Sequence, residues 1–136
     1  MKSNCKNCGK EFVFMPSQQS GKYCSNKCQL DYQYKTITKP RIENGEVHHP
    51  LTLKRYLTEN NGGYKCNICN LSNWIGKDIA LHIDHIDGNS DNNFPSNLRF
   101  LCPNCHSQTE TYCGRNVKNT KRATYKRRYR LKNIHE

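Results

Sequence analysis

The hydrophobic positions in the middle of the chain first follow a helical spacing. Leu51, Leu53, Tyr56 and Leu57 recur close to the period of an α-helix, and the polar run of residues 60–63 (Asn-Asn-Gly-Gly) is typical of a helix end. We therefore expect a short amphipathic helix that begins near Leu51.

Further along, the pattern changes to short runs that favour strands. Residues 79–86 and 98–101 are β-prone, and the first run is followed by the turn-forming residues Asp-Gly-Asn at 87–89. Pro103 is suited to a helix start, so residues 104 to about 112 are expected to be helical. The predicted order is strand, loop, strand, helix, a ββα unit within a small α+β protein.

Composition limits how such a chain can be stabilised. Only 34% of the 136 residues are hydrophobic, so a large apolar core is excluded and a stabilising cross-link is expected. Nine cysteines are available for it. With no signal peptide or membrane-spanning run in view, we expect a cytoplasmic protein, in which zinc binding is favoured over disulfides.

The cysteines fall into two sets of four that have zinc-ligand spacing. Four thiolates in two close pairs can surround one structural zinc ion. The sets are Cys5, Cys8, Cys24 and Cys28, and Cys66, Cys69, Cys102 and Cys105. The alternatives are free buried thiols for the second set and a redox pair for the first, although no βαβ pattern accompanies it. Cys113 is left over and receives no role.

These patterns predict four segments. Residues 1–36 form a four-cysteine zinc finger, residues 37–50 with their prolines and Gly45 form a linker, residues 51–114 form the ββα domain, and residues 115–136 form a basic tail.

The charge of the chain indicates its partner. A net charge of +11 predicts binding to a polyanion, and nucleic acid is the first candidate. An anionic membrane is the second, but no amphipathic apolar face or lipidation motif supports it. Tail residues expected to contact DNA phosphates are Arg115, Lys118, Lys121, Arg122, Lys126, Arg127, Arg128 and Arg130. The alternative is a solvated charge run without a partner.

Four polar residues in and beside the predicted ββα unit carry candidate chemistry. Asp84 offers a carboxylate to a divalent cation, and His85 beside it offers an imidazole that takes a proton near neutral pH. Asn97 follows His85 by twelve residues, and His106 follows Asn97 by nine. An isolated Asp-His pair would be weak evidence for a site, but these four residues lie among the cysteines of the second set.

The runs Leu81–Asn89 and Asn97–His106 resemble the zinc-bearing branch of the HNH endonuclease family, of the small phage and bacterial type. The resemblance continues through residues 108–111 and 114–116. The first four-cysteine set resembles a zinc ribbon or treble clef, a less specific match.

This resemblance implies a ββα-metal fold and a one-metal hydrolysis of phosphodiester bonds in DNA, with double-stranded DNA favoured, in the cytoplasm of a bacterial or phage-infected cell. His85 would be the general base, Asp84 and His106 would hold Mg²⁺ or Mn²⁺, and Asn97 would orient the loop of His85. Since His106 directly follows Cys105, the zinc would also hold a catalytic ligand in place.

Other polar residues receive weaker expectations. His82 could assist the metal, but a surface histidine with ordinary partners is favoured. His48 and His49 are expected to be solvated, and the loop asparagines need no catalytic role. These are Asn89, Asn92 and Asn93.

Two other functions stay open. One is a non-catalytic, zinc-dependent DNA-binding protein on the same scaffold, and the other is an RNA-directed nuclease or binder. Target sequence, nicking against double-strand cutting, and oligomeric state are not encoded in these patterns.

Overall fold

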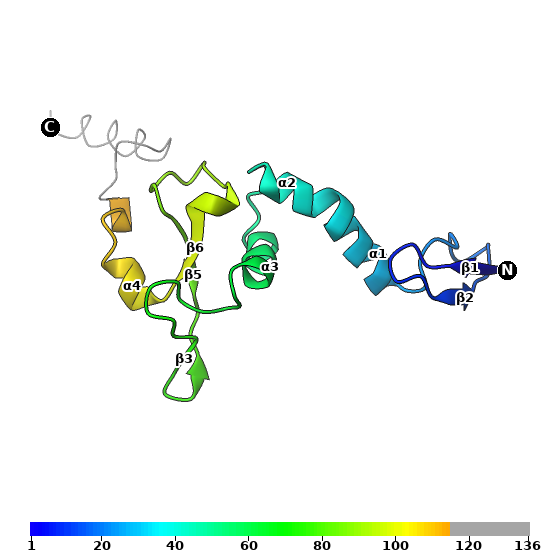
Figure 1. Ribbon diagram of the computed structural model, residues 1–136, viewed down its shortest axis with the longest axis horizontal. Helices are drawn as coiled ribbons and strands as arrows, with labels where there is room; N and C mark the ends of the chain where they lie inside the picture. The colour runs from blue at the N-terminus through cyan, green and yellow to red at the C-terminus, as the bar shows by residue number, and fades with distance from the viewer. Residues whose placement is uncertain (115–136) are drawn as a thin grey trace, which may run out of the picture. The chain divides into compact units, whose positions relative to one another are not determined.

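The computed structural model describes residues 1–114, and the predicted basic tail lies outside this range. Contacts divide the chain into two compact units, residues 1–41 and the part from Ile42 onward. Short helices and two-stranded antiparallel sheets make up both units, which confirms the predicted α+β class (Figure 1). Within residues 1–114 no helix is long and apolar enough to cross a membrane.

The first unit is a hairpin followed by a helix. Strand β1 (Lys2–Asn4) pairs antiparallel with β2 (Glu11–Val13). Helix α1 (Asn26–Gln33) begins after Ser25, whose hydroxyl oxygen accepts a hydrogen bond from the Cys28 N–H at 3.2 Å. This N-cap satisfies a backbone donor in the first helical turn and fixes where Cys28 lies.

The helical backbone continues into residues that we predicted to be a linker. A π-helical segment, η1 (Tyr34–Thr38), leads into α2 (Lys39–Glu43), which contains Pro40. A proline has no N–H for the carbonyl four residues earlier and its ring crowds that residue, here Thr36. Because Thr36 lies in the wider π turn, the proline is accommodated, and only residues 44–49 of the predicted linker are irregular.

The second unit contains the predicted amphipathic helix, α3 (Pro50–Asn60), with Pro50 in its first turn. Its buried side chains are Leu53, Tyr56 and Leu57, while Leu51 is 71% exposed. The fully or nearly buried apolar side chains of this unit include Ile42, Leu53, Leu57, Leu98, Phe100 and Leu101.

A small hairpin that the sequence analysis did not predict follows the first cysteine pair of this unit. Strand β3 (Asn73–Trp74) pairs with β4 (Lys77–Asp78) through Ile75 and Gly76, whose φ angles are 51° and 72°. A two-residue type I′ hairpin turn requires positive φ angles at both central residues, but a β-branched residue rarely adopts one. Because of Ile75, the sequence pattern did not predict this turn.

The predicted ββα order is present. Strand β5 (His82–His85) pairs antiparallel with β6 (Leu98–Leu101), and α4 (Pro103–Ser107) follows directly. A short 3₁₀ turn, η2 (Pro95–Asn97), precedes β6, and another, η3 (Tyr112–Gly114), ends the described chain. Helix α4 packs on one side of the β5–β6 hairpin and α3 lies on the other (Figure 1).

Two of these elements are shorter than expected. Strand β5 ends at His85. The Ile86 N–H still donates to the backbone carbonyl of Asn97, the next position in register, but the Asp87 N–H donates to the side chain of Asn97, so the strand pairing goes no further. Helix α4 stops at Ser107 because the Thr109 hydroxyl donates to the carbonyl of His106 at 2.9 Å, which caps the helix end.

Candidate functional site

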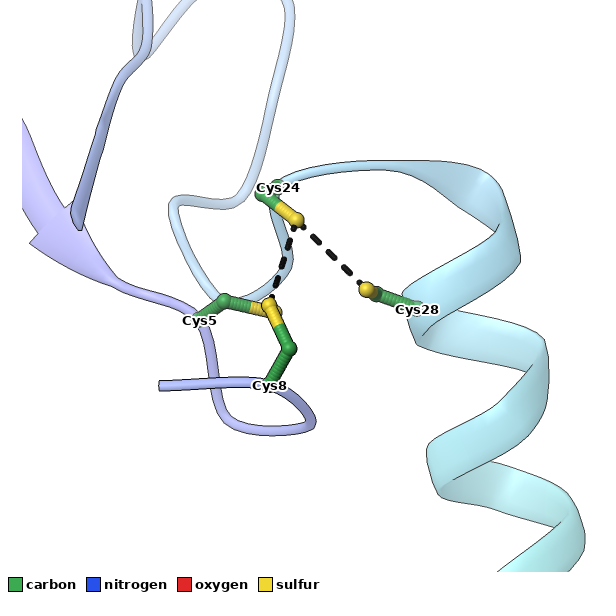
Figure 2. Close-up of side chains that lie close together, drawn as sticks. All are labelled: Cys5, Cys8, Cys24 and Cys28. Atoms are coloured by element: carbon green, nitrogen blue, oxygen red, sulfur yellow. Dashed lines mark hydrogen bonds between the residues drawn. The ribbon is translucent and has the colours of Figure 1, made fainter. Parts of the chain in front are cut away.

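The four cysteines of the first unit point their sulfur atoms toward one another (Figure 2). All four sulfurs lie within 4.8 Å of one another, with the Cys8 and Cys24 sulfurs 3.7 Å apart and the Cys24 and Cys28 sulfurs 3.5 Å apart. A tetrahedral zinc ion with Zn–S bonds of about 2.3 Å places its sulfur ligands about 3.8 Å apart. The cluster therefore has the dimensions of a zinc site.

The four cysteines of the second unit form an equivalent cluster. Their sulfurs also lie within 4.8 Å of one another, and the Cys69 and Cys102 sulfurs are 3.8 Å apart. Cys102 caps α4, where its sulfur accepts from the Cys105 N–H at 3.4 Å. This cluster joins the two ends of the ββα domain, as the sequence predicted.

The first cysteine pairs of both clusters lie in turns with the same hydrogen bonds. In each turn, the residue four positions after the first cysteine donates its N–H to the backbone carbonyl of that cysteine. This residue has a positive φ, 75° at Gly9 and 61° at Asn70. The first cysteine in turn donates to the carbonyl five positions later, at Lys10 and Leu71 respectively. Glycine and asparagine tolerate this backbone conformation best, which explains why each follows its cysteine pair.

The electrostatics of both clusters suit a cation. Burial raises the pKa of Cys66, but backbone N–H groups of Ile68, Cys69 and Cys102 outweigh it and lower the pKa to about 6. In the same cluster, burial and the neighbouring sulfurs raise the pKa of Cys105 to about 12. Backbone donors thus favour one thiolate, while the crowding of four sulfurs opposes the others. A bound Zn²⁺ would relieve that repulsion, so both clusters fit zinc.

Beside the second cluster, Asp84 and His106 converge on the face of the hairpin that α4 covers. Asp84 is 4% exposed, and its Oδ1 lies 3.7 Å from Nε2 of His106. Its Oδ2 accepts a hydrogen bond from Nε of Arg99 at 2.7 Å, and Arg99 stands directly opposite Asp84 in the strand register. Arg99 therefore fixes the carboxylate and leaves Oδ1 directed toward His106.

His82 lies on the same face and contacts His106. The Nδ1 atoms of the two rings are 2.9 Å apart, and the rings meet edge to face. One of these nitrogens must carry the hydrogen of this bond. His82 is thus a hydrogen-bond partner of His106, whereas the sequence favoured a surface histidine with ordinary partners.

Asn97 organises the loop that follows His85. Its Oδ1 accepts from the Asp87 N–H at 3.0 Å, while its Nδ2 donates to Oδ1 of Asp87 and to the carbonyl of Asn92, each at 2.9 Å. Burial alone raises the pKa of Asp87, but hydrogen bonds from Asn89, Asn92 and Asn97 and the interaction with His85 hold it below its usual range. The loop is therefore built around an ionised Asp87.

His85 lies on the opposite face of the hairpin, toward α3, because consecutive residues of a strand point to opposite sides. Its Nε2 is 3.0 Å from Oδ1 of Asn93, and Nδ2 of Asn93 is 2.7 Å from Nδ1 of His48. These three residues line a cleft of about 450 Å³. In the described part of the chain, no hydrogen bond or ion pair joins His85 to Asp84 or His106.

Three of these partners were not singled out by sequence reasoning. Arg99 was detectable, because pairing residues 79–86 with 98–101 in the correct register puts a basic residue opposite Asp84. Asn93 and His48 were not, because they are 45 residues apart and only the folded chain brings them together. His48 is exposed, as expected for a solvated residue, yet its ring is held by Asn93.

Comparison with known proteins gives one curated relative. Over 90 residues the chain is 41% identical to the H-N-H endonuclease F-TflIV of Escherichia phage T5. The matched region covers 65% of this chain but only 39% of the relative. No family model and no solved structure matches. The similarity confirms the resemblance to HNH endonucleases that the sequence indicated.

Proposed function

We propose that this chain hydrolyses phosphodiester bonds in nucleic acid, with double-stranded DNA as substrate, and uses one divalent cation, Mg²⁺ or Mn²⁺. The observation that carries the proposal is the convergence of a buried carboxylate, Asp84, with His106 at 3.7 Å within the ββα unit. The similarity to a protein named as an H-N-H endonuclease supports the same chemistry.

The geometry of Asp84 and His106 is suited to a shared cation. Two ligand atoms that each lie about 2.1 Å from one cation are at most about 4.2 Å apart. The observed 3.7 Å falls inside that limit, and Arg99 occupies only the other carboxylate oxygen. A cation held there would neutralise charge on the scissile phosphate and on the leaving 3′ oxygen.

His85 is the proposed general base. It directly follows Asp84 and is the last residue of β5, so a phosphate bound around the end of this strand would contact side chains from both faces of the hairpin. The ring takes a proton from water, the water oxygen bonds to phosphorus, and the bond from phosphorus to the 3′ oxygen breaks. The leaving oxygen then takes a proton from solvent, and a 5′-phosphate remains.

The zinc clusters and the positive charge complete the proposal. The second cluster includes Cys105, so it fixes α4 and with it His106, the next residue. The net charge of +11 favours a polyanionic substrate. The basic residues 115–130 are proposed to contact phosphates, although they lie outside the described residues.

Cleavage of supercoiled plasmid by the zinc-loaded protein tests the proposal. Added Mg²⁺ or Mn²⁺ should produce nicked or linear DNA. His85→Ala should lower the rate by at least about 10²–10⁴-fold without loss of zinc or DNA affinity, since it removes proton transfer alone. Asp84→Ala and His106→Ala should be partly rescued at high cation concentration. His49→Ala is the matched control, because this histidine is exposed and bonded to Thr52.

A folded His85→Ala protein that cuts at the wild-type rate would contradict the assignment. Absence of cleavage by the wild-type protein, together with tight DNA binding, would favour the non-catalytic alternative. Preferential cleavage or binding of structured RNA in a competition experiment would instead identify RNA as the substrate.

A further inference from the structure

The side chain of Asn93 lies between two histidines that come from distant parts of the chain. It is 4% exposed, although asparagine is polar. Its Oδ1 is 3.0 Å from Nε2 of His85, and its Nδ2 is 2.7 Å from Nδ1 of His48. The same Nδ2 lies 3.4 Å from the carbonyl oxygen of Ser90. Each side-chain polar atom of this buried amide therefore has a partner.

The Ser90 carbonyl decides which way the amide is turned. A carbonyl oxygen only accepts hydrogen bonds, so the atom facing it must be the NH₂ group of Asn93. The reversed amide would place two oxygen atoms against each other. Hence Oδ1 faces His85, and Nδ2 faces both Ser90 and His48.

This orientation determines which ring nitrogens carry hydrogen. Since Oδ1 of Asn93 can only accept, Nε2 of His85 must be the protonated nitrogen of the neutral ring. Its unprotonated nitrogen is then Nδ1. On the other side, Nδ2 of Asn93 can only donate, so Nδ1 of His48 accepts and the hydrogen of that ring resides on Nε2.

We propose that Asn93 is a positioning residue that holds His85 in the tautomer protonated at Nε2, so that Nδ1 is the atom that takes the proton from water. His48 holds Asn93 in turn. The inference rests on the proposed function of His85 and adds the base nitrogen and two supporting residues to it.

The surroundings favour a fixed ring over a freely turning one. His85, Asn93 and His48 stand together on the wall of the cleft of about 450 Å³, whose other lining residues include the apolar Leu53, Ile83 and Phe100. The His85 side chain is half-buried there, and among the described residues its hydrogen bond is the one to Asn93.

The first test reads the tautomer without any cleavage. Long-range ¹H–¹⁵N spectra of ¹⁵N-histidine-labelled, zinc-loaded protein should show neutral His85 protonated at Nε2 in the wild type. Asn93→Ala should give a mixture of tautomers, whereas Asn93→Gln, which keeps both an acceptor oxygen and a donor NH₂ group, should restore the Nε2 form. A wild-type His85 protonated at Nδ1, or a tautomer unchanged in Asn93→Ala, would overturn the proposal.

The second test separates positioning from a general structural role. Asn93→Ala should lower kcat by roughly 10- to 100-fold with little change of KM for plasmid, as for other residues that orient a catalytic group. Asn93→Gln should recover part of the loss, because it keeps both the acceptor and the donor. His48→Gln should be more active than His48→Ala, because glutamine supplies an acceptor. Asn89→Ala is the control, an asparagine of the same loop whose side chain accepts only from the Asp91 N–H.

The two failures differ in their results. If His85→Ala abolishes cleavage but the His85 tautomer is the same with and without Asn93, this inference alone is overturned. If Asn93 determines the tautomer but the His85→Ala variant still cleaves, both the proposed base and this inference are overturned. Asn93 then has only a structural role. Equal zinc content and dispersed spectra in all variants exclude misfolding as the cause.

Discussion

Replacement of Asn97 by alanine should release the loop that follows His85 and leave the rest of the ββα domain intact. The side chain makes three hydrogen bonds: it accepts from the Asp87 N–H, and it donates to the Asp87 carboxylate and to the Asn92 carbonyl. A neutral hydrogen bond contributes about 0.5–1.5 kcal/mol, and the bond to the exposed carboxylate is counted as neutral because water screens it. At about 1 kcal/mol for each bond, their joint loss destabilises the loop by about 3 kcal/mol.

Amide hydrogen exchange measures this loss residue by residue. A loss of about 3 kcal/mol corresponds to a roughly 150-fold fall in protection of the Asp87 N–H. The Ile86 N–H is an internal control, since it donates to the backbone carbonyl of residue 97, which alanine retains. Asn89→Ala removes one hydrogen bond in the same loop and should cost about 1 kcal/mol at most.

Unchanged exchange at Asp87 in the Asn97→Ala protein would refute the reasoning, because the loop would then be held by other contacts. Equal loss of protection across β5 and β6 would refute it too, since that result would assign Asn97 to the stability of the whole domain.

Three further outcomes follow from the same structure. Elemental analysis should find two zinc ions per chain, and chelation should abolish the dispersed spectrum of both units; less than about one zinc would contradict the cluster assignments. Leu57→Ala should lower the free energy of unfolding by about 2–5 kcal/mol, because this side chain is fully buried. Leu51→Ala on the same helix should change it by less than about 0.5 kcal/mol. Equal effects of the two substitutions in denaturant titrations would contradict the observed helix face. Truncation before Arg115 should weaken DNA binding to all sequences alike and reduce the slope of affinity against salt, and an unchanged slope would mean that the tail does not contact phosphate.

The amino-acid sequence by itself determined the features that depend on residue type and short spacing. Cysteine pairs with two or three residues between them have the spacing of zinc ligands, so both clusters could be predicted. The spacing of hydrophobic residues and the β-prone runs predicted α3, β6 and the ββα order. Asp84 and His106 were singled out because the runs that contain them resemble HNH endonucleases, and the fold brings their side chains to 3.7 Å.

The tertiary structure decided what depends on register, chain direction and contacts between distant segments. Pairing of Asp84 with Arg99 required the exact register of β5 and β6, since a shift of one residue would turn each side chain to the other face. The π turn at Thr36 allowed a helix where Pro40 predicted a linker, and an isoleucine at positive φ concealed the β3–β4 hairpin.

The environment of His85 shows the same limit most clearly. Its partner Asn93 is close in sequence, but the orientation of that amide depends on the Ser90 carbonyl and on His48 from the segment before α3. Sequence patterns identify a histidine that can act as a base. Which of its nitrogens carries the proton is a property of hydrogen-bond partners, and only folding brings these partners to the ring.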